Sequence, residues 1–505
     1  MRVAIASDHA GVGLQQATID AVRPAGHEPV LIGQATEGDD YPDVALAVGG
    51  AIRSGRVQRG VLLCGSGAGV TVAANKIPLV RAALAYDTYT ARQMVEQDDV
   101  NVLALGARVI GTAVAADVVA AFVGAEFSGA ERHARRLSKV LAMEATRVHG
   151  AAADVLARGQ RLWLDGIEAS ALDDGRMAHW IGDYAVTGAT TAPEGLAATL
   201  STGVYRDRLA AHVADGVTEP ETLALSLALD DAVATADLLG GFHAATVGAD
   251  GYVSIDLPPA LVDDLDGTLE LARRLHGAAG RRNLMVKVPA TRAGCAATRR
   301  LVAEGIPVHV TLVFSVEQCR DAVDAYLDGV EDRLRADEDP AVGSLVSLHI
   351  APWDEATAGQ LPPALRGTVG PVAATVLADA FAQVHLSQRW QRLAAAGARP
   401  QRLSFAGTTA PAPLPPTSYV DALGVADTTL IVPETILETL NERERAAAVD
   451  IADPAAAQRL EETGVSLDAL AAELCDDALQ RATRQWRMLL GVLERLGDRR
   501  AGSDD

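Results

Sequence analysis

Short apolar runs alternate with amphipathic segments along residues 1–150. The apolar runs are "RVAIASD", "EPVLIG", "RGVLLC", "VRAALAYD" and "VNVLALGARVI". The segments between them, such as "GVGLQQATIDAVRPAG" and "YPDVALAVGGAIRSG", repeat their apolar residues at helical spacing. Continuous apolar strands separated by helices are typical of a parallel sheet covered on both faces. We therefore predict a doubly wound, Rossmann-like domain over residues 1–150.

A second series of alternating strand-like and helix-like segments begins near Arg161, and it contains eight predicted strands. The predicted strands are "RLWLD", "AVTGATT", "YVSIDL", "NLMVKVP", "PVHVTLVF", "GSLVSLHI", "RLSFAGTT" and "TTLIVPE". Segments of helical period separate them, and one long helical stretch, residues 131–159, leads into the first strand. Eight βα units predict a (β/α)₈ barrel over residues 155–505.

The barrel strands carry polar residues at or near their carboxyl ends. These are Asp165, Thr190, Asp256, Lys287, Thr311, Ser347 and Thr408. In this fold the carboxyl ends of the strands form the active site. Turn chemistry is the competing explanation for some of these polar residues, but it does not account for a lysine in an apolar strand.

Lys287 stands out because the chain has only three lysines, the others being Lys76 and Lys139. Burial favours the neutral, nucleophilic form of an amine, which can form a Schiff base with a ketose. Arginine is always protonated and cannot do this. The alternative is a structural ion pair between Lys287 and Asp165 or Asp256.

In the first domain, "LLCGSGAGVTVAANK" places Cys64 at a strand end before a glycine-rich turn. Such a turn directs backbone N–H groups into one concavity, which favours an anion and stabilises a thiolate base. The spacing does not fit a dinucleotide-binding loop. The sequence leaves open whether Cys64 is a base or a buried structural cysteine.

Composition narrows the possible partners. The formal net charge of −22 argues against nucleic acid and anionic membrane surfaces, which bind basic faces. Four cysteines without a CxxC pair do not indicate a disulfide framework. No segment reads as a signal peptide or transmembrane helix, so we expect a cytoplasmic protein.

Several motifs of the first domain resemble the ribose-5-phosphate isomerase B family. They are "SDHAG", "DYP" at 40–42, "CGSGAGVTVAANK", "NVLALGARV" and "ERHARR". The resemblance implies aldose–ketose isomerisation through an enediolate, with Cys64 as the base and no metal or cofactor. It also implies an active site at a subunit interface, and therefore a homo-oligomer, at least a dimer.

The same resemblance assigns roles to individual residues. Ser66 and the loop Gly65, Gly67 and Gly69 would stabilise the enediolate oxygen, and Asp8 and Tyr41 would hold or open the sugar. The phosphate would be held by His9, Arg132, His133 and Arg136, and a hydroxyl by Asn101. Gln97, Asp98 and Asp99 stand where the family often has a histidine associated with ring opening.

The second domain resembles the transaldolase family through "RLWLDGIEASAL", "VSIDLPPALVDDLDGTLELARRL", "NLMVKVPAT", "IPVHVTLVFSVEQ" and "VPETILETL". The resemblance implies Lys287 as the Schiff-base nucleophile and Asp165 as the proton-transfer group. Asp256 and Thr311 would hold a catalytic water, and the substrate would also contact Thr190, His309, Ser347 and His349.

Departures from this family gather around the substrate. Ala192 replaces an asparagine, Asp256 a glutamate and His309 an asparagine, while His349 stands where an aromatic residue is usual. Pro352 replaces a phosphate-binding arginine, and Pro411 lies close to the place of a second basic residue. An arginine elsewhere at the barrel mouth would restore phosphate binding.

The sequence thus predicts a bifunctional enzyme of sugar phosphates related to the non-oxidative pentose phosphate pathway. For the barrel, three alternatives remain: a differently anchored ketose, simple aldol cleavage aided by His309 or His349, or a non-catalytic scaffold for ligand binding or assembly. A specialised route to unusual sugars is a variant of the first.

Overall fold

A computed structural model describes residues 1–33, 40–53, 56–77, 79–130, 132–133, 136–137, 140, 150–443, 460 and 462–501. The chain divides into two compact units. One comprises Met1–Arg147 with Asp237–Gly251, and the other comprises Val148–Ala236 with Tyr252–Asp505.

The first unit contains a five-stranded parallel sheet in the order β2-β1-β3-β5-β4. Its strands are β1 Arg2–Ser7, β2 Glu28–Leu31, β3 Arg59–Cys64, β4 Ala82–Leu84 and β5 Val102–Gly106. The helices of this sheet are α1 Gln15–Val22, α2 Tyr41–Arg53, α3 Ala68–Ala74, α4 Thr88–Asp98 and α5 Thr112–Val123. The predicted doubly wound parallel sheet is confirmed.

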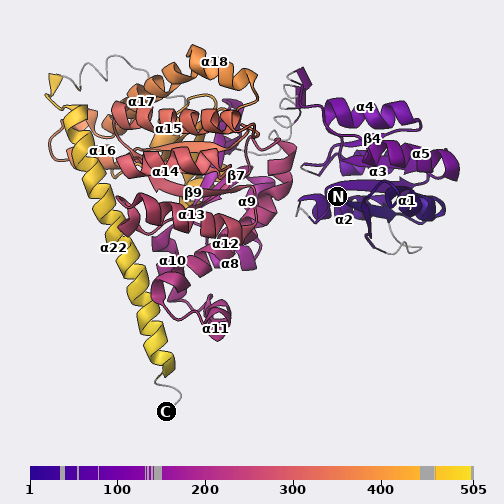
Figure 1. The fold of residues 1–505 in the computed structure, drawn as a ribbon, viewed down its shortest axis with the longest axis horizontal. Helices are drawn as coiled ribbons and strands as arrows, with labels where there is room; N and C mark the ends of the chain where they lie inside the picture. The colour runs from indigo at the N-terminus through magenta and orange to yellow at the C-terminus, as the bar shows by residue number, and fades with distance from the viewer. Residues whose placement is uncertain are drawn as a thin grey trace. The chain divides into compact units, whose positions relative to one another are not determined.

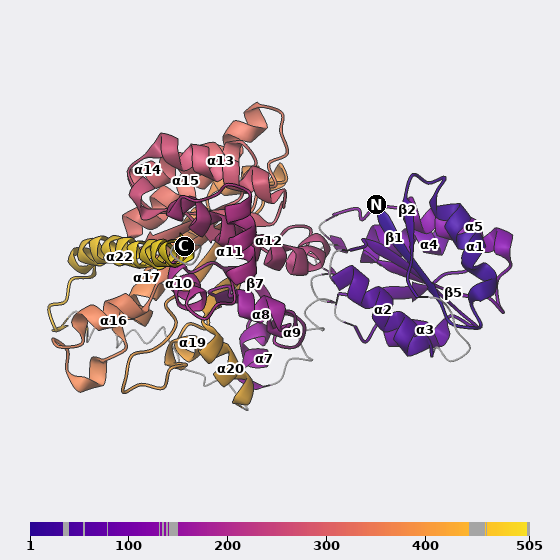
Figure 2. The same ribbon diagram turned by 90° about the horizontal axis from the view of Figure 1, so that it is seen from below.

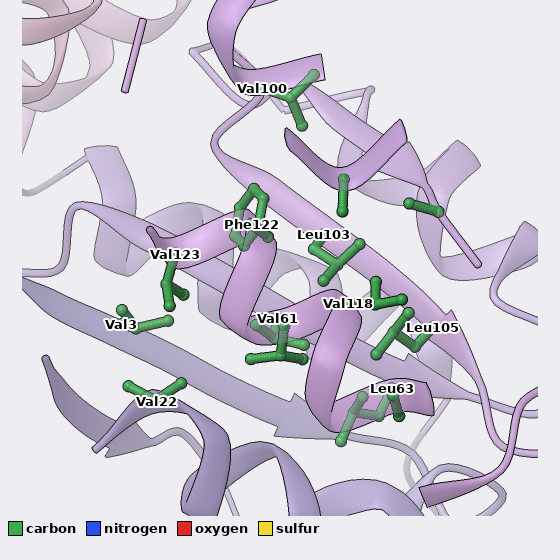
Figure 3. Close-up of a cluster of buried hydrophobic side chains, with 14 of the residues drawn as sticks. Val3, Val22, Val61, Leu63, Val100, Leu103, Leu105, Val118, Phe122 and Val123 are labelled. Atoms are coloured by element: carbon green, nitrogen blue, oxygen red, sulfur yellow. The ribbon is translucent and has the colours of Figure 1, made fainter. Parts of the chain in front are cut away.

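Alternation along the strands builds two separate cores. Val61 and Leu63 of β3 face a cluster shared with α1, α4 and α5, which Figure 3 shows in close-up. Leu62 and Cys64, one residue out of phase, face the second cluster with α2 and α3. Figure 2 shows the sheet between these two helical layers. Because both faces are buried, the strands read as continuous apolar runs rather than alternating ones.

The second unit contains a closed parallel barrel in the order β10-β11-β12-β13-β6-β7-β8-β9. Its strands are β6 Arg161–Asp165, β7 Val186–Thr190, β8 Val253–Asp256, β9 Leu284–Pro289, β10 Val308–Val313, β11 Ser344–His349, β12 Arg402–Ala406 and β13 Thr428–Val432. All eight predicted barrel strands are confirmed.

Helices connect the barrel strands, and several connections are longer than one helix. They are α7 Gly150–Ala157, α8 Ala169–Asp173, α9 Arg176–Asp183, α10 Pro193–Leu200, α11 Arg206–Ala214, α12 Pro220–Ala245, α13 Leu265–Ala279, α14 Arg292–Ala303, α15 Val316–Arg335, α16 Ala351–Thr357, α17 Val369–His385, α18 Gln388–Ala395, α19 Ser418–Ala422, α20 Glu434–Glu442 and α22 Leu467–Ala501. The 35-residue α22 packs beside α10 and α16, as the yellow helix of Figure 1 shows. This contact positions the end of the chain to contribute to the barrel's site.

The long helix predicted over residues 131–159 is described only in part. Residues 131, 134–135, 138–139 and 141–149 lie outside the described residues, and α7 accounts for the last part of the stretch. Within the described chain, no single helix is long and apolar enough to cross a membrane. One bent pair, α17 with α18, meets those criteria together.

Candidate active sites

Cys64 lies at the carboxyl end of β3, where the glycine-rich turn begins. Its side chain is buried, and its Sγ accepts a hydrogen bond of 3.0 Å from the backbone N–H of Gly67. Gly67 has a φ of 80°, and a Cβ there would lie 2.3 Å from the Leu84 side chain. A glycine is therefore required to direct this N–H at the sulfur, where it stabilises a thiolate.

Asp8 follows β1 at the same edge of the sheet. Its backbone N–H donates to the carbonyl of Leu63 at 3.1 Å, and its Oδ1 accepts from the N–H groups of Ala10 and Gly11 at 2.8 and 2.9 Å. One carboxylate oxygen is thus used to hold the turn after β1. His9, the next residue, is exposed.

Other predicted isomerase residues surround the turn. Ser66 is exposed. The ring of Tyr41, at the start of α2, lies against Gly69, where an added Cβ would be only 3.2 Å from the ring. These residues thus lie at the same carboxyl edge of the sheet as Cys64 and Asp8.

Two residues of this edge were not predicted from the sequence. The Tyr86 hydroxyl donates to the carbonyl of Ser66 at 2.7 Å, and burial, followed by the nearby Cys64, raises the pKa of its phenol. Arg108 follows β5, donates its backbone N–H to Gly65 and is exposed. Both residues follow strand ends, so the rule applied to the barrel strands would have indicated them here too.

The remaining predicted isomerase residues lie at the opposite, amino edge of the sheet. Asn101 precedes β5, which runs parallel to β3 with Cys64 beside Gly106. The Asn101 amide donates to the carbonyl of Leu79 at 2.7 Å and accepts from the N–H of Arg81 at 2.9 Å. The length of the strand, about 15 Å at 3.3 Å per residue, separates Asn101 from Cys64 within one chain.

Between the described residues, no hydrogen bond joins Arg132, His133 or Arg136 to Cys64. Ser128 bonds the imidazole of His133 at 2.7 Å, and its backbone N–H donates to the carbonyl of Glu96 in the last turn of α4, at the amino edge. His133 is buried, and its Nε2 accepts from the Arg132 guanidinium at 3.0 Å. Arg132 and Arg136 are exposed.

In the barrel, the carboxyl ends of the strands open into a pocket of about 630 Å³. Five predicted residues line it: Asp165, Asp256, Lys287, Thr311 and His349. The pocket is where the fold predicts an active site, because parallel strands present their carboxyl ends at one mouth.

Lys287 is largely buried and holds the centre of this pocket. Its Nζ lies 2.9 and 3.0 Å from the two carboxylate oxygens of Asp256 and 3.3 Å from the carbonyl of Thr191. The Thr191 hydroxyl donates to Asp256 at 2.8 Å and accepts from its backbone N–H at 3.0 Å. The amine is thereby fixed beside the Asp256 carboxylate.

Asp165 faces the same pocket. The Asp165 side chain is accessible from the cavity, but protein surrounds the cavity on its other sides. The resulting loss of hydration raises the pKa of the carboxyl. The Lys287 charge opposes the shift, while Asp256 and Glu194 add to it. A carboxyl with a raised pKa suits proton transfer near neutral pH.

His309 and Ser347 lie beneath the pocket and do not line it. The Ser404 hydroxyl donates to the carbonyl of Val346 at 3.0 Å, so it accepts from Ser347 at 2.6 Å. Ser347 in turn accepts from Nε2 of His309 at 2.5 Å, which leaves Nδ1 to accept from Ser254 at 2.8 Å. His309 is therefore a neutral imidazole, and burial, followed by the charge of Lys287, lowers its pKa well below the ordinary value.

His349 does reach the pocket. Its Nε2 lies 3.1 Å from the Thr311 hydroxyl, and its ring packs against Phe314 with 5.9 Å between centroids. Burial, followed by the charges of Lys287 and Arg481, lowers the pKa of His349 to about 4.

This shift predicts a contribution of His349 to acid sensitivity. Between pH 6.5 and pH 4 the unfolded chain binds a proton that the folded chain does not, so stability falls as the pH falls. We expect His349→Phe to reduce the slope of unfolding free energy against pH by up to about 1.4 kcal/mol per pH unit in that window. All five tryptophans lie between residues 163 and 486, so urea unfolding followed by tryptophan fluorescence reports on the barrel.

The matched control for this experiment is His179→Phe, at an exposed histidine of α9. It is expected to keep most of the wild-type slope. An unchanged slope in His349→Phe would contradict the assignment.

Two further predicted positions differ in the structure. Thr190 is buried and donates to the carbonyl of Thr191, which lines the pocket in its place. Pro411 is not among the described lining residues, whereas Pro352 is. The sequence also gave no signal for the contribution of α22, which places Asp477, Arg481, Gln485 and Trp486 in the pocket wall.

Comparison with known proteins identifies the barrel. The family described as Transaldolase/Fructose-6-phosphate aldolase matches residues 162–493, which is more than half of the chain. The chain belongs to the transaldolase family. It is 34% identical to the transaldolase of Neisseria gonorrhoeae over 347 residues, covering 67% of this chain and 98% of that protein. It is 33% identical to the transaldolase of Mycolicibacterium smegmatis over 352 residues, covering 67% of this chain and 95% of that protein.

The transaldolase domain is fused to a second one. The family described as Ribose/Galactose Isomerase matches residues 3–140, so the first domain is ribose-5-phosphate isomerase B-like. This part is 42% identical to the type B ribose 5-phosphate isomerase of Trypanosoma brucei, covering 28% of this chain and 97% of that chain, with a TM-score of 0.28. It is also 41% identical to the ribose-5-phosphate isomerase B of Clostridium thermocellum, covering 29% of this chain and 99% of that chain, with a TM-score of 0.28.

Proposed function

We propose that the chain is a bifunctional enzyme that isomerises an aldose phosphate at Cys64 and transfers a ketol fragment at Lys287. For the first activity, the Cys64 thiolate removes a proton from C2 of the open-chain aldose. The electron pair moves to the C1 oxygen, and the proton of the C2 hydroxyl passes to that oxygen. The thiol then returns its proton to C1, and C2 becomes the carbonyl carbon of the ketose. The support is the Gly67 N–H at 3.0 Å from Sγ, which stabilises the thiolate.

We propose that this site is completed by a second copy of the chain. Cys64, Asp8 and Tyr41 belong to one edge of the domain, whereas Asn101 and the group around His133 belong to the other. In a two-fold dimer, the carboxyl edge of each copy can face the amino edge of the other. A two-fold interface makes each such contact twice, once in each direction. The split of the predicted residues between the two edges is what supports an oligomer.

Mixed oligomers test this arrangement. Cys64→Ala and Arg132→Ala are each expected to remove ribose 5-phosphate isomerisation, because each damages a different half of the site. Co-expressed with different tags, they are expected to recover about a quarter of the wild-type activity, since half of randomly formed dimers are mixed and one of their two sites is intact.

The control pairs Cys64→Ala with Asp8→Asn, both at the carboxyl edge, and no recovery is expected there. If the first pair recovers no activity although mixed oligomers form, each chain carries its own complete site.

For the second activity, the Lys287 amine attacks the C2 carbonyl of a ketose and water leaves, giving an imine. A carboxylate, assigned to Asp165, takes the proton of the C4 hydroxyl. The C3–C4 bond then breaks, its electron pair forms the enamine, and an aldose leaves; an acceptor aldehyde reverses these steps. The observation that carries this proposal is a largely buried amine inside a pocket whose lining includes the carboxylates of Asp165 and Asp256.

Two assays on the purified wild-type chain test the proposal. Ribose 5-phosphate is expected to give ribulose 5-phosphate, and borohydride with a ketose is expected to give a stable adduct on the peptide that contains Lys287. Absence of an adduct with every ketose from dihydroxyacetone upward would remove the second activity, and a chain unable to isomerise any aldose phosphate would remove the first.

A further inference from the structure

The charges around the barrel pocket define the substrate that fits it. Among the described lining residues there are five carboxylates, one lysine and one arginine: Asp165, Glu194, Asp256, Glu355 and Asp477 against Lys287 and Arg481. This described part of the lining is therefore net negative whether Asp165 is protonated or ionised.

Both basic groups are paired with carboxylates in this structure. Lys287 lies 2.9 Å from Asp256, and Arg481 of α22 lies 3.2 Å from a carboxylate oxygen of Glu355 on α16. Arg481 stands at the mouth, near Pro352 and Glu355, and is the one position among the described lining residues from which a guanidinium could hold a phosphate. Its pairing with Glu355 offsets that charge.

The other polar contacts across the mouth are uncharged or acidic. The Gln485 side chain donates to Glu194 at 2.6 Å, linking α22 to the start of α10. Pro193, Leu257, Pro259 and Pro352 give the remaining wall an apolar character. Hydroxyl groups can bond to such carboxylates, whereas a phosphate dianion is repelled by them.

We propose that the transaldolase domain acts on sugars without a phosphate group, and that the Glu355–Arg481 pair enforces this choice. The inference rests on the proposed Schiff-base activity of Lys287 and adds its substrate class: an uncharged ketose donor and an uncharged aldehyde acceptor. The barrel then differs in substrate charge from the isomerase domain fused to it.

The test compares fructose with fructose 6-phosphate on the full-length wild-type chain. The quantity measured is kcat/KM for formation of the borohydride-trapped adduct at Lys287, at constant low ionic strength. We expect fructose to be favoured by about tenfold or more, because each unbalanced carboxylate near the phosphate disfavours it. Added salt should reduce the ratio of kcat/KM for fructose to kcat/KM for fructose 6-phosphate, since salt screens the exposed charges at the rim of the pocket.

Glu355→Gln tests the pair itself. Removing this carboxylate frees Arg481 and lowers the negative charge, so the ratio should shift toward fructose 6-phosphate by about tenfold. Glu304→Gln is the matched control, because Glu304 pairs with Arg273 on an exposed surface and is not among the lining residues. Glu304→Gln should keep the wild-type ratio of the two kcat/KM values.

The outcomes separate the two proposals. If wild type forms the adduct from fructose 6-phosphate as well as or better than from fructose, the substrate inference is overturned while the Schiff-base activity stands. If inorganic phosphate at fixed ionic strength competes with fructose, Arg481 is available to anions and the inference is overturned as well. If neither sugar gives an adduct, the proposed function itself fails, and the inference fails with it.

Discussion

Replacing Lys287 with arginine is expected to abolish adduct formation in the barrel while leaving the fold in place. The guanidinium retains the positive charge that Asp256 binds, but it cannot lose a proton and attack a carbonyl. We expect the rate of ketose cleavage to fall by about 1,000-fold or more, since removal of a catalytic nucleophile can cost up to about a millionfold. Mass spectrometry after borohydride reduction should find no adduct on the peptide 283–294.

Lys76→Arg is the matched control, because it makes the same change at a described lysine of the first domain. It should form the adduct at the wild-type rate. Isomerisation of ribose 5-phosphate should persist in both variants, which shows that each is folded in its first domain. An adduct formed by Lys287→Arg would show that another residue is the nucleophile.

Replacing Cys64 with alanine is the second large effect. The variant removes the base beside the Gly67 N–H, and isomerisation of ribose 5-phosphate is expected to fall by about 100- to 10,000-fold, the range for loss of a general base. KM should change less than kcat, because the thiolate acts on a carbon-bound proton and does not hold the phosphate. Continuous detection of ribulose 5-phosphate measures both.

Cys295→Ala is the control for this variant. Burial, followed by the nearby Asp321, raises the pKa of the Cys295 thiol to about 11, so it stays protonated and takes no part in isomerisation. Its replacement should leave kcat unchanged. Isomerase activity that survives in Cys64→Ala would leave this residue a structural one, the alternative that the sequence alone kept open.

The strands could be predicted because their burial is complete. In the five-stranded sheet, Val61 and Leu63 face one core and Leu62 and Cys64 the other, so a whole segment is apolar. Such runs between amphipathic helices fit a parallel sheet and little else. The same logic counted eight strands into a barrel, and the barrel then placed Lys287 and Asp256 side by side in register.

Depth and phase within a strand could not be predicted as well. His309 and Ser347 each stand two residues before the strand position that reaches the pocket, and two residues are about 6.6 Å along a strand. Thr190 differs from Thr191 by one residue, and the register between β6 and β7 shifts between Leu162 and Trp163. A single-residue shift exchanges which side chain faces the interior, and no local pattern in the sequence announces it.

The sequence by itself determined the two folds and indicated a lysine with neighbouring carboxylates at the barrel's mouth, because these follow from periodicity and from residue types at strand ends. Only the tertiary structure decided the charge of the barrel's mouth. Arg481, Asp477 and Gln485 belong to a helix that follows the last strand by more than thirty residues, and where such a helix packs depends on long-range contacts. The separation of the isomerase residues between two edges of one sheet is likewise a property of strand direction and order, which residue identities alone do not contain.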